Sequence, residues 1–96
     1  MKKMNIQLEH LQDKERFITK INSDQATLKY RKFDETTLEY FSTFVPEEIR
    51  GGKVGYQLVV FGLEYAKENN YKVIPTCWFV KKVMERKEEY QTMIAS

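Results

Sequence analysis

The stretch from Val45 to Gly55 carries the residues with the clearest chemical use. It reads Val-Pro-Glu-Glu-Ile-Arg-Gly-Gly-Lys-Val-Gly, so two basic side chains, Arg50 and Lys53, stand among three glycines. Glycines let a backbone approach a ligand closely, and the first amides of a helix have no hydrogen-bond partner within it. A loop of this kind at the start of a helix favours anions, and the segment therefore predicts a binding site for a phosphorylated ligand.

Two well-known phosphate motifs do not fit this segment. A P-loop requires Gly-Lys followed by Ser or Thr, but Val54 follows Lys53, so no hydroxyl is placed to hold a magnesium ion. A dinucleotide-binding fingerprint requires Gly-x-Gly-x-x-Gly within repeated βαβ units, and the pattern of this chain predicts a single unit. What remains is a short basic loop, rich in glycine, that opens a helix.

The segments after this loop extend the pattern. The run 45–66 is followed by Lys-Val-Ile-Pro-Thr-Cys-Trp-Phe-Val at 72–80 and later by Glu89-Tyr90. With these segments in this order, the chain resembles the small, single-domain branch of the GNAT acetyltransferase superfamily. The resemblance covers the C-terminal half of the chain and the order of the strands before it. It implies a minimal GNAT-like α+β fold in one domain, residues 1–96.

The loop matches the superfamily motif, Arg/Gln-x-x-Gly-x-Gly/Ala, at its two ends. Arg50 and Gly55 occupy the first and last positions, whereas Lys53 stands at the middle glycine with Gly52 beside it. The branch also commonly carries His-Thr just before the loop, and this chain has Ser-Thr at those positions.

The resemblance implies an acetyl-CoA-binding protein that acts as an N-acetyltransferase on an unidentified amine. In the superfamily, the pantetheine arm enters a gap between the strand before the loop and the strand after the helix, which here would be 43–45 and 74–77. The alternative is a non-catalytic CoA-binding or protein-interaction module. The residues predicted to bind acetyl-CoA are Phe44, Val45, Arg50, Gly51, Gly52, Lys53, Val54 and Gly55.

Cys77 is the candidate catalytic residue. It ends the strand beside the implied pantetheine gap, so the resemblance would bring its thiol near the thioester, where a thiolate could accept an acetyl group. The alternative is a buried cysteine that packs as a small hydrophobic side chain. Met84 stands where the superfamily often has a tyrosine acid, and a thioether cannot donate a proton. The sequence therefore leaves open whether the protein is an enzyme.

The composition limits the partners. Sixteen basic and fourteen acidic residues leave a formal net charge of +2, which is too small to predict nucleic-acid binding. No apolar run reaches the ~20 residues needed to span a bilayer, and a lone cysteine cannot form an internal disulfide. The N-terminus lacks the apolar segment of a signal peptide. We therefore expect a cytoplasmic protein, monomeric or weakly dimeric, that has no metal, nucleic-acid or membrane partner.

The first half of the chain must supply the sheet that positions this loop. Apolar and polar residues alternate there, and turn-forming residues separate the alternating segments. Short connections favour an antiparallel meander. The expected strands are 5–11, 17–21, 26–31 and 38–45.

The second half predicts a helix over 53–69, with Gly55 and Gly62 both on its apolar side, so the helix should approach the sheet closely. The following strand, 71–77, contains Pro75, which has no amide donor and should mark the point where pairing ends and the strand splays from its neighbour. A short C-terminal helix would then bury one face, formed by Phe79, Val80, Val83 and Met84.

Overall fold

The computed structural model describes residues 7–51 and 53–95. They form one five-stranded sheet in the order β1-β2-β3-β4-β5, together with α-helices and two short 3-10 helices. The strands are β1 (Gln7–Leu11), β2 (Arg16–Ile21), β3 (Asp24–Asp34), β4 (Thr37–Phe44) and β5 (Lys72–Pro75). The helices are η1 (Gln12–Lys14), η2 (Glu47–Ile49), α1 (Val54–Glu68), α2 (Trp78–Glu85) and α3 (Glu88–Gln91).

The first four strands form the predicted antiparallel meander. Phe17 of β2 pairs with Leu28 of β3, which in turn pairs with Thr43 of β4. β3 is longer than predicted, because it begins at Asp24 and continues to Asp34. Its register against β4 shifts twice, between residues 29 and 30 and between 32 and 34. Such bulges bend a strand and increase its twist.

β5 joins the sheet parallel to β4 through the crossover helix α1. The pairing runs from Thr37 opposite Lys72 to Tyr40 opposite Pro75, where it ends as the missing proline amide predicts. One further link follows, in which the Cys77 amide donates to the Tyr40 carbonyl at 3.1 Å. The second half of β4 therefore continues without β5 beside it, and the two strands diverge.

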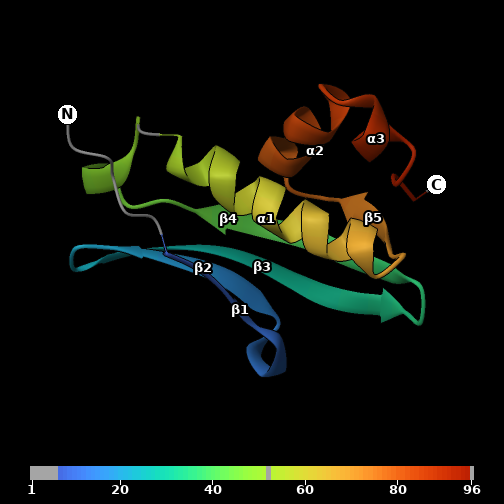
Figure 1. Ribbon diagram of the computed structural model, residues 1–96, viewed down its shortest axis with the longest axis horizontal. Coiled ribbons are helices and arrows are strands. Elements are labelled where there is room, and N and C mark those ends of the chain that lie inside the picture. The colour runs from blue at the N-terminus through green and yellow to red at the C-terminus, as the bar shows by residue number, and fades with distance from the viewer. Residues whose placement is uncertain (1–6, 52, 96) are drawn as a thin grey trace.

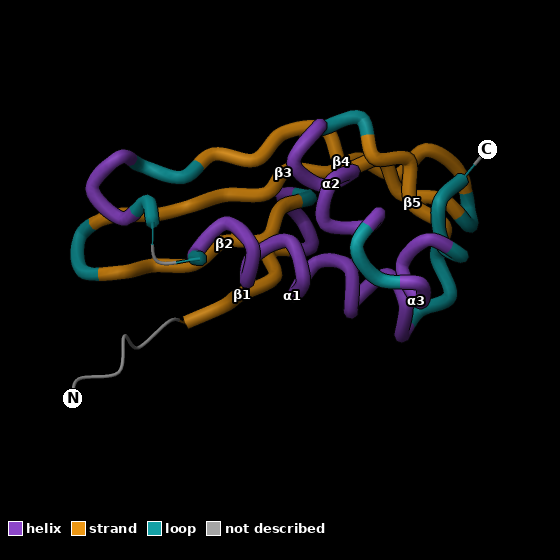
Figure 2. Tube along the Cα trace, turned by 90° about the horizontal axis from the view of Figure 1, so that it is seen from above, coloured by secondary structure: helices purple, strands orange, loops and turns teal. Residues whose placement is uncertain are grey.

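The three α-helices lie together on one side of the sheet (Figure 1). Viewed from above, α1 crosses the sheet lengthwise, and α3 lies near the C-terminal end of the chain (Figure 2). The outer edge of β5 is covered by the C-terminal segment, because the Val73 amide donates to the Met93 carbonyl and the Ala95 amide donates to the Val73 carbonyl, each at 2.8 Å. None of the helices among the described residues is long and apolar enough to cross a membrane.

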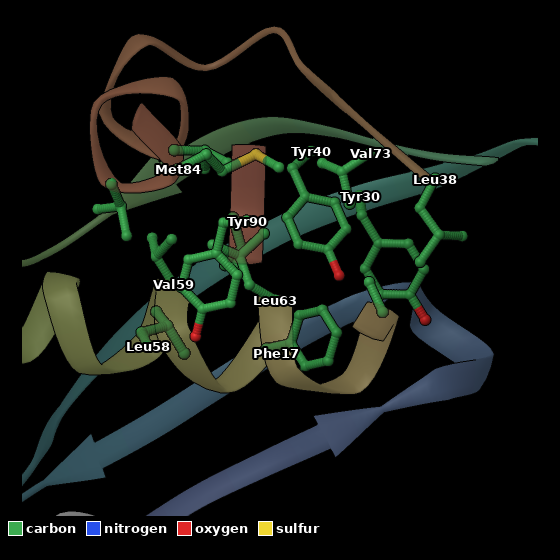
Figure 3. Packing of buried hydrophobic residues seen from close by; sticks show 14 of the residues in the cluster. Phe17, Tyr30, Leu38, Tyr40, Leu58, Val59, Leu63, Val73, Met84 and Tyr90 are labelled. Atoms are coloured by element: carbon green, nitrogen blue, oxygen red, sulfur yellow. The ribbon is translucent and has the colours of Figure 1, made fainter. Parts of the chain in front are cut away.

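One hydrophobic core fills the space between the helices and the sheet. Figure 3 shows Phe17 and Tyr40 from the strands packed with Leu63 of α1. The prediction that α1 approaches the sheet closely is confirmed at Gly62, where a Cβ atom would lie only 2.8 Å from Cδ2 of Leu28. The Tyr40 hydroxyl donates to the carbonyl of the same glycine and fixes the height of the helix above the sheet.

Candidate functional site

A pocket of ≈ 580 Å³ lies where β4 ends, α1 begins and the chain passes from β5 to α2. Seven of the eight residues predicted to bind acetyl-CoA line it, and so does Cys77; the eighth, Gly52, lies outside the described residues. The structure thus brings distant predicted residues around one hollow, while their role in binding stays a prediction. The lining residues are Thr43, Phe44, Val45, Arg50, Gly51, Lys53, Val54, Gly55, Tyr56, Cys77, Trp78 and Phe79.

Two residues of the loop before α1 have positive φ angles. Gly51 has φ +91°, which glycine adopts without steric cost. Lys53 has φ 62°, in the left-handed region, which costs an ordinary residue about 1 kcal/mol or more. This conformation gives a physical reason for a glycine at the middle position of the superfamily motif. Lys53 departs from the motif and carries the strain.

The start of α1 presents backbone donors at the pocket. The first helical hydrogen bond runs from the Gln57 amide to the Lys53 carbonyl at 3.0 Å, so the amides of Val54, Gly55 and Tyr56 precede the helical ladder. The N-cap side chain of Lys53 does not cap the helix. Together with the helix dipole, such amides attract an anion.

Two cations flank these amides. Arg50 donates from Nε to the Val45 carbonyl at 2.9 Å, which ties the loop to the end of β4 and leaves the terminal guanidinium nitrogens for other acceptors. Lys53 is exposed at the pocket. Within residues 7–51 and 53–95, neither side chain has a carboxylate partner within 4.0 Å. The mouth of the pocket is therefore positively charged.

Gly55 keeps the apolar wall of the pocket in place. A Cβ atom there would lie 3.2 Å from Cε2 of Phe79 and 3.2 Å from Cγ2 of Val45. Those side chains come from α2 and from the end of β4, so three elements meet at this glycine. Any side chain at position 55 would push them apart or narrow the pocket.

Cys77 lines the pocket as the N-cap residue of α2. Its side chain is half-buried, and its Sγ lies 3.4 Å from the Thr43 hydroxyl across the gap between β4 and β5. Among the described lining residues, the pocket contains no carboxylate and no imidazole. The protonatable groups there are the Cys77 thiol and the Tyr56 phenol, with the cations Arg50 and Lys53. The arrangement can hold an anion and offer a thiol, but it has no obvious general base.

Met84, at the position of the superfamily tyrosine, and Tyr90, part of the pattern that carries the resemblance, both lie in the core. Met84 is fully buried, so no proton donor occupies the position of the superfamily tyrosine. Tyr90 is also buried, and its hydroxyl donates to Glu64 at 2.6 Å. Burial and this carboxylate raise the pKa of Tyr90, and the residue does not line the pocket.

Three aromatic residues of the pocket were missed as binding residues. Tyr56 follows Lys53 at helical spacing, and Trp78 and Phe79 open α2 directly after Cys77. Trp78 is 72% exposed, which is unusual for so large an apolar side chain. The sequence did contain a signal for this part of the pocket, namely an aromatic pair at the start of a predicted helix, directly after the candidate cysteine. Among the described residues, no group of three or more His, Cys, Asp or Glu is placed to hold a metal ion.

The comparison with known families agrees with this geometry. Residues 16–93 match the family described as GCN5-related N-acetyl-transferase. The chain belongs to this family. The chain is similar in sequence to Protein NATD1 of Danio rerio and to Protein NATD1 of Homo sapiens, with 27% identity over 82 residues in each case. These alignments cover 83% of this chain, and 74% and 73% of the two relatives.

The fold of this GCN5-related protein also matches a solved structure. A GCN5-like protein from Staphylococcus aureus, determined by solution NMR, superposes with a TM-score of 0.69 and 28% identity over 100% of this chain and 92% of that one. The predicted α+β GNAT-like fold and the superfamily resemblance are both confirmed.

Proposed function

We propose that this protein binds acetyl-CoA in the pocket between β4, α1 and α2 and transfers the acetyl group to an amine. The observation that carries the proposal is the position of the anion-binding features. Free amides and two cations lie at the start of α1, next to the place where β4 and β5 diverge. Membership of the GCN5-related family supports the same ligand.

The phosphate end of the ligand would lie against the loop. The amides of Val54, Gly55 and Tyr56 would donate to diphosphate oxygens, and Arg50 and Lys53 would add charge-assisted hydrogen bonds. Gly51 would let the backbone come close, because nothing lies within 4 Å of its Cβ position.

The arm of the ligand would enter the gap between the diverging strands. Val45 and Phe79 supply apolar walls there, and Thr43 and Cys77 supply polar atoms. Apolar walls with a few convergent polar groups are typical of pockets that hold small organic ligands. When bound, acetyl-CoA would supply an acetyl group activated as a thioester.

The test of binding is isothermal titration with CoA, comparing the unaltered protein with the double variant Arg50→Ala/Lys53→Ala. Removing two charge-assisted contacts should weaken binding by roughly tenfold or more and should flatten its dependence on salt. The matched control is Lys20→Ala/Lys29→Ala, which removes the same charge from exposed strand positions. An absence of binding by the unaltered protein at millimolar CoA would contradict the proposal.

A non-catalytic CoA-binding module is the second candidate. It is favoured by the lack of a carboxylate or imidazole among the described lining residues and by the buried Met84. Acetyl transfer to an amine requires removal of the amine proton and a proton for the leaving thiolate. Release of CoA in the presence of an amine, followed by chromatography, separates the two candidates, because a module would bind acetyl-CoA without consuming it.

Cys77 offers a specific prediction on catalysis. Its thiolate would attack the carbonyl carbon, forming a new S–C bond as the CoA sulfur leaves and takes up a proton. Incubation with acetyl-CoA should therefore add one acetyl group. Intact-protein mass spectrometry should detect the adduct, and Cys77→Ser should lack it. If CoA binds and no adduct forms, Cys77 is a packing residue.

The proposal includes a cytoplasmic setting, because the lone Cys77 would remain a reduced thiol there. The expectation of a monomer or weak homodimer stays a prediction, which sedimentation at several protein concentrations would test.

A further inference from the structure

A second groove, of ≈ 420 Å³, adjoins the first pocket between the start of α1 and α2. Lys53, Tyr56, Trp78 and Phe79 line both hollows, so a ligand that leaves the first pocket beside Lys53 enters the second. The groove does not coincide with any residue that the sequence assigned to binding, apart from Lys53.

Three cations meet in this groove. Lys82 and Arg86 are four residues apart and line it from the α2 side, whereas Lys53 comes from the start of α1. Like charges four residues apart on a helix repel one another. Among the described residues, none of the three has a carboxylate within 4.0 Å. The groove therefore gathers positive charge that the described protein does not neutralise.

Aromatic rings lie beside these cations. The Trp78 side chain is 72% exposed, and Tyr56 is half-buried next to it in the groove wall. Exposed aromatic rings provide stacking surfaces for nucleobases. The combination of flat rings and clustered cations fits a nucleotide that carries a phosphate of its own.

We propose that this groove binds the adenosine end of CoA and that Lys53, Lys82 and Arg86 recognise its 3′-phosphate. The inference rests on the proposed function, because it takes the same ligand and extends it past the diphosphate. Lys53 is central to it. It stands at the junction of the two hollows, in place of the glycine of the motif, and its left-handed backbone is the kind of strain that persists where a side chain has a use.

The test compares CoA with dephospho-CoA, which differs only in lacking the 3′-phosphate. Isothermal titration at one fixed ionic strength should show CoA binding roughly tenfold tighter or more, as expected for lost charge-assisted contacts. In Lys82→Ala/Arg86→Ala, the affinity for CoA should fall most of the way to that for dephospho-CoA, because only Lys53 then remains to contact the 3′-phosphate, while the affinity for dephospho-CoA should stay unchanged. Lys20→Ala/Lys29→Ala, with the same loss of net charge, should keep the full difference between the two ligands.

Two results would overturn the inference in different ways. Equal affinities of the unaltered protein for CoA and dephospho-CoA would refute recognition of the 3′-phosphate and leave the proposed function standing. Failure of both ligands to bind would refute the proposed function and this inference with it. An equal loss in the Lys20→Ala/Lys29→Ala control would also contradict it, because the difference would then come from net charge and not from the groove.

Discussion

The two ends of α1 are built in opposite ways. Its start lies beside glycines, a strained Lys53 and two hollows, and the nearby cations have no carboxylate partner among the described residues. Its end packs over rings, where His10 stacks on Phe17 at 4.3 Å and meets the edge of Tyr65 at the same distance. The Tyr30 hydroxyl completes this aromatic cluster, 2.6 Å from Nε2 of His10.

The capping of the helix follows the same division. At the C-terminal end, Asn69 uses both its amide and its side chain to donate to the Tyr65 carbonyl, at 3.1 and 2.8 Å. At the N-terminal end, no side chain among the described residues caps the helix. We infer that the C-terminal, aromatic end of α1 stabilises the fold, whereas its N-terminal, glycine-rich end keeps backbone amide donors available for a ligand.

The largest effect should come from breaking the aromatic end. Phe17→Ala would remove a fully buried ring that packs against several others, at a cost of about 3–5 kcal/mol in the free energy of unfolding. For a domain of this size, that corresponds to a fall in Tm of roughly 12 °C or more. Urea denaturation measures it. The control is Phe33→Ala, whose ring is 63% exposed and whose loss should cost less than about 0.5 kcal/mol. Equal losses of stability in the two variants would contradict the inference that the aromatic end of α1 stabilises the fold.

The two glycines of α1, Gly55 and Gly62, should respond differently to substitution by alanine. Gly62→Ala should destabilise the fold by about 1–2 kcal/mol, because its Cβ would meet buried Leu28 at 2.8 Å. Gly55→Ala should leave the free energy of unfolding within about 0.5 kcal/mol, since the gain in helix propensity offsets contacts at 3.2 Å, but it should weaken CoA binding. Denaturation and titration of both variants check this, and a reversed order of the two stabilities would be inconsistent with it.

Replacing Lys53 by glycine should increase the stability of the fold and weaken the binding of CoA. Lys53→Gly would relieve the positive φ and should raise the free energy of unfolding by about 0.5–1 kcal/mol, while removing the cation shared by both hollows. Thermal unfolding and CoA titration on the same samples measure both quantities. A variant that is both less stable and equally able to bind CoA would show that the strain has no connection with the ligand.

The smallest effect concerns pH at the aromatic end. Burial lowers the pKa of His10, whereas the unfolded chain has the ordinary value of 6.5. The unfolded state therefore takes up a proton first, so stability should be full above pH 6.5 and should decline as the pH falls below it. Burial raises the pKa of Tyr30 to about 12, so its hydroxyl, 2.6 Å from Nε2 of His10, stays neutral over this pH range. His10→Gln should flatten the decline between pH 7 and 5 in urea denaturation, and an unchanged slope would exclude His10 as its cause.

The sequence predicted the order and antiparallel pairing of the first four strands, but not the bulges or the full length of β3. Alternation and turn residues were sufficient for the meander, and Pro75 marked the end of β5 because a residue without an amide limits pairing wherever it lies. The two bulges of β3 depend on its register against β4, which no local pattern records. The length of β3 was missed for the same reason, since exposed residues near Asp34 pair across a hairpin without an apolar face.

The candidate site was likewise predicted only in part. The loop from Val45 to Gly55 is continuous in sequence, so its glycines and charges could be recognised there. The second groove joins the start of α1 to α2, and Lys82 and Arg86 lie outside the face of that helix that the sequence predicted to be buried. The packing of Phe79 against Gly55 brings these elements together, and that contact depends on the folded arrangement of three elements.

An NMR titration of the 15N-labelled protein with CoA would show directly whether the ligand binds at the start of α1. We expect amide shifts at Gly51, at residues 54–56 and at Cys77, with little change at His10 and Tyr65 around the opposite end of α1. Residues around Arg86 should respond to CoA and much less to dephospho-CoA. Shifts centred on the aromatic end, or no shifts at millimolar CoA, would contradict the assignment of the glycine end of α1 as the binding site.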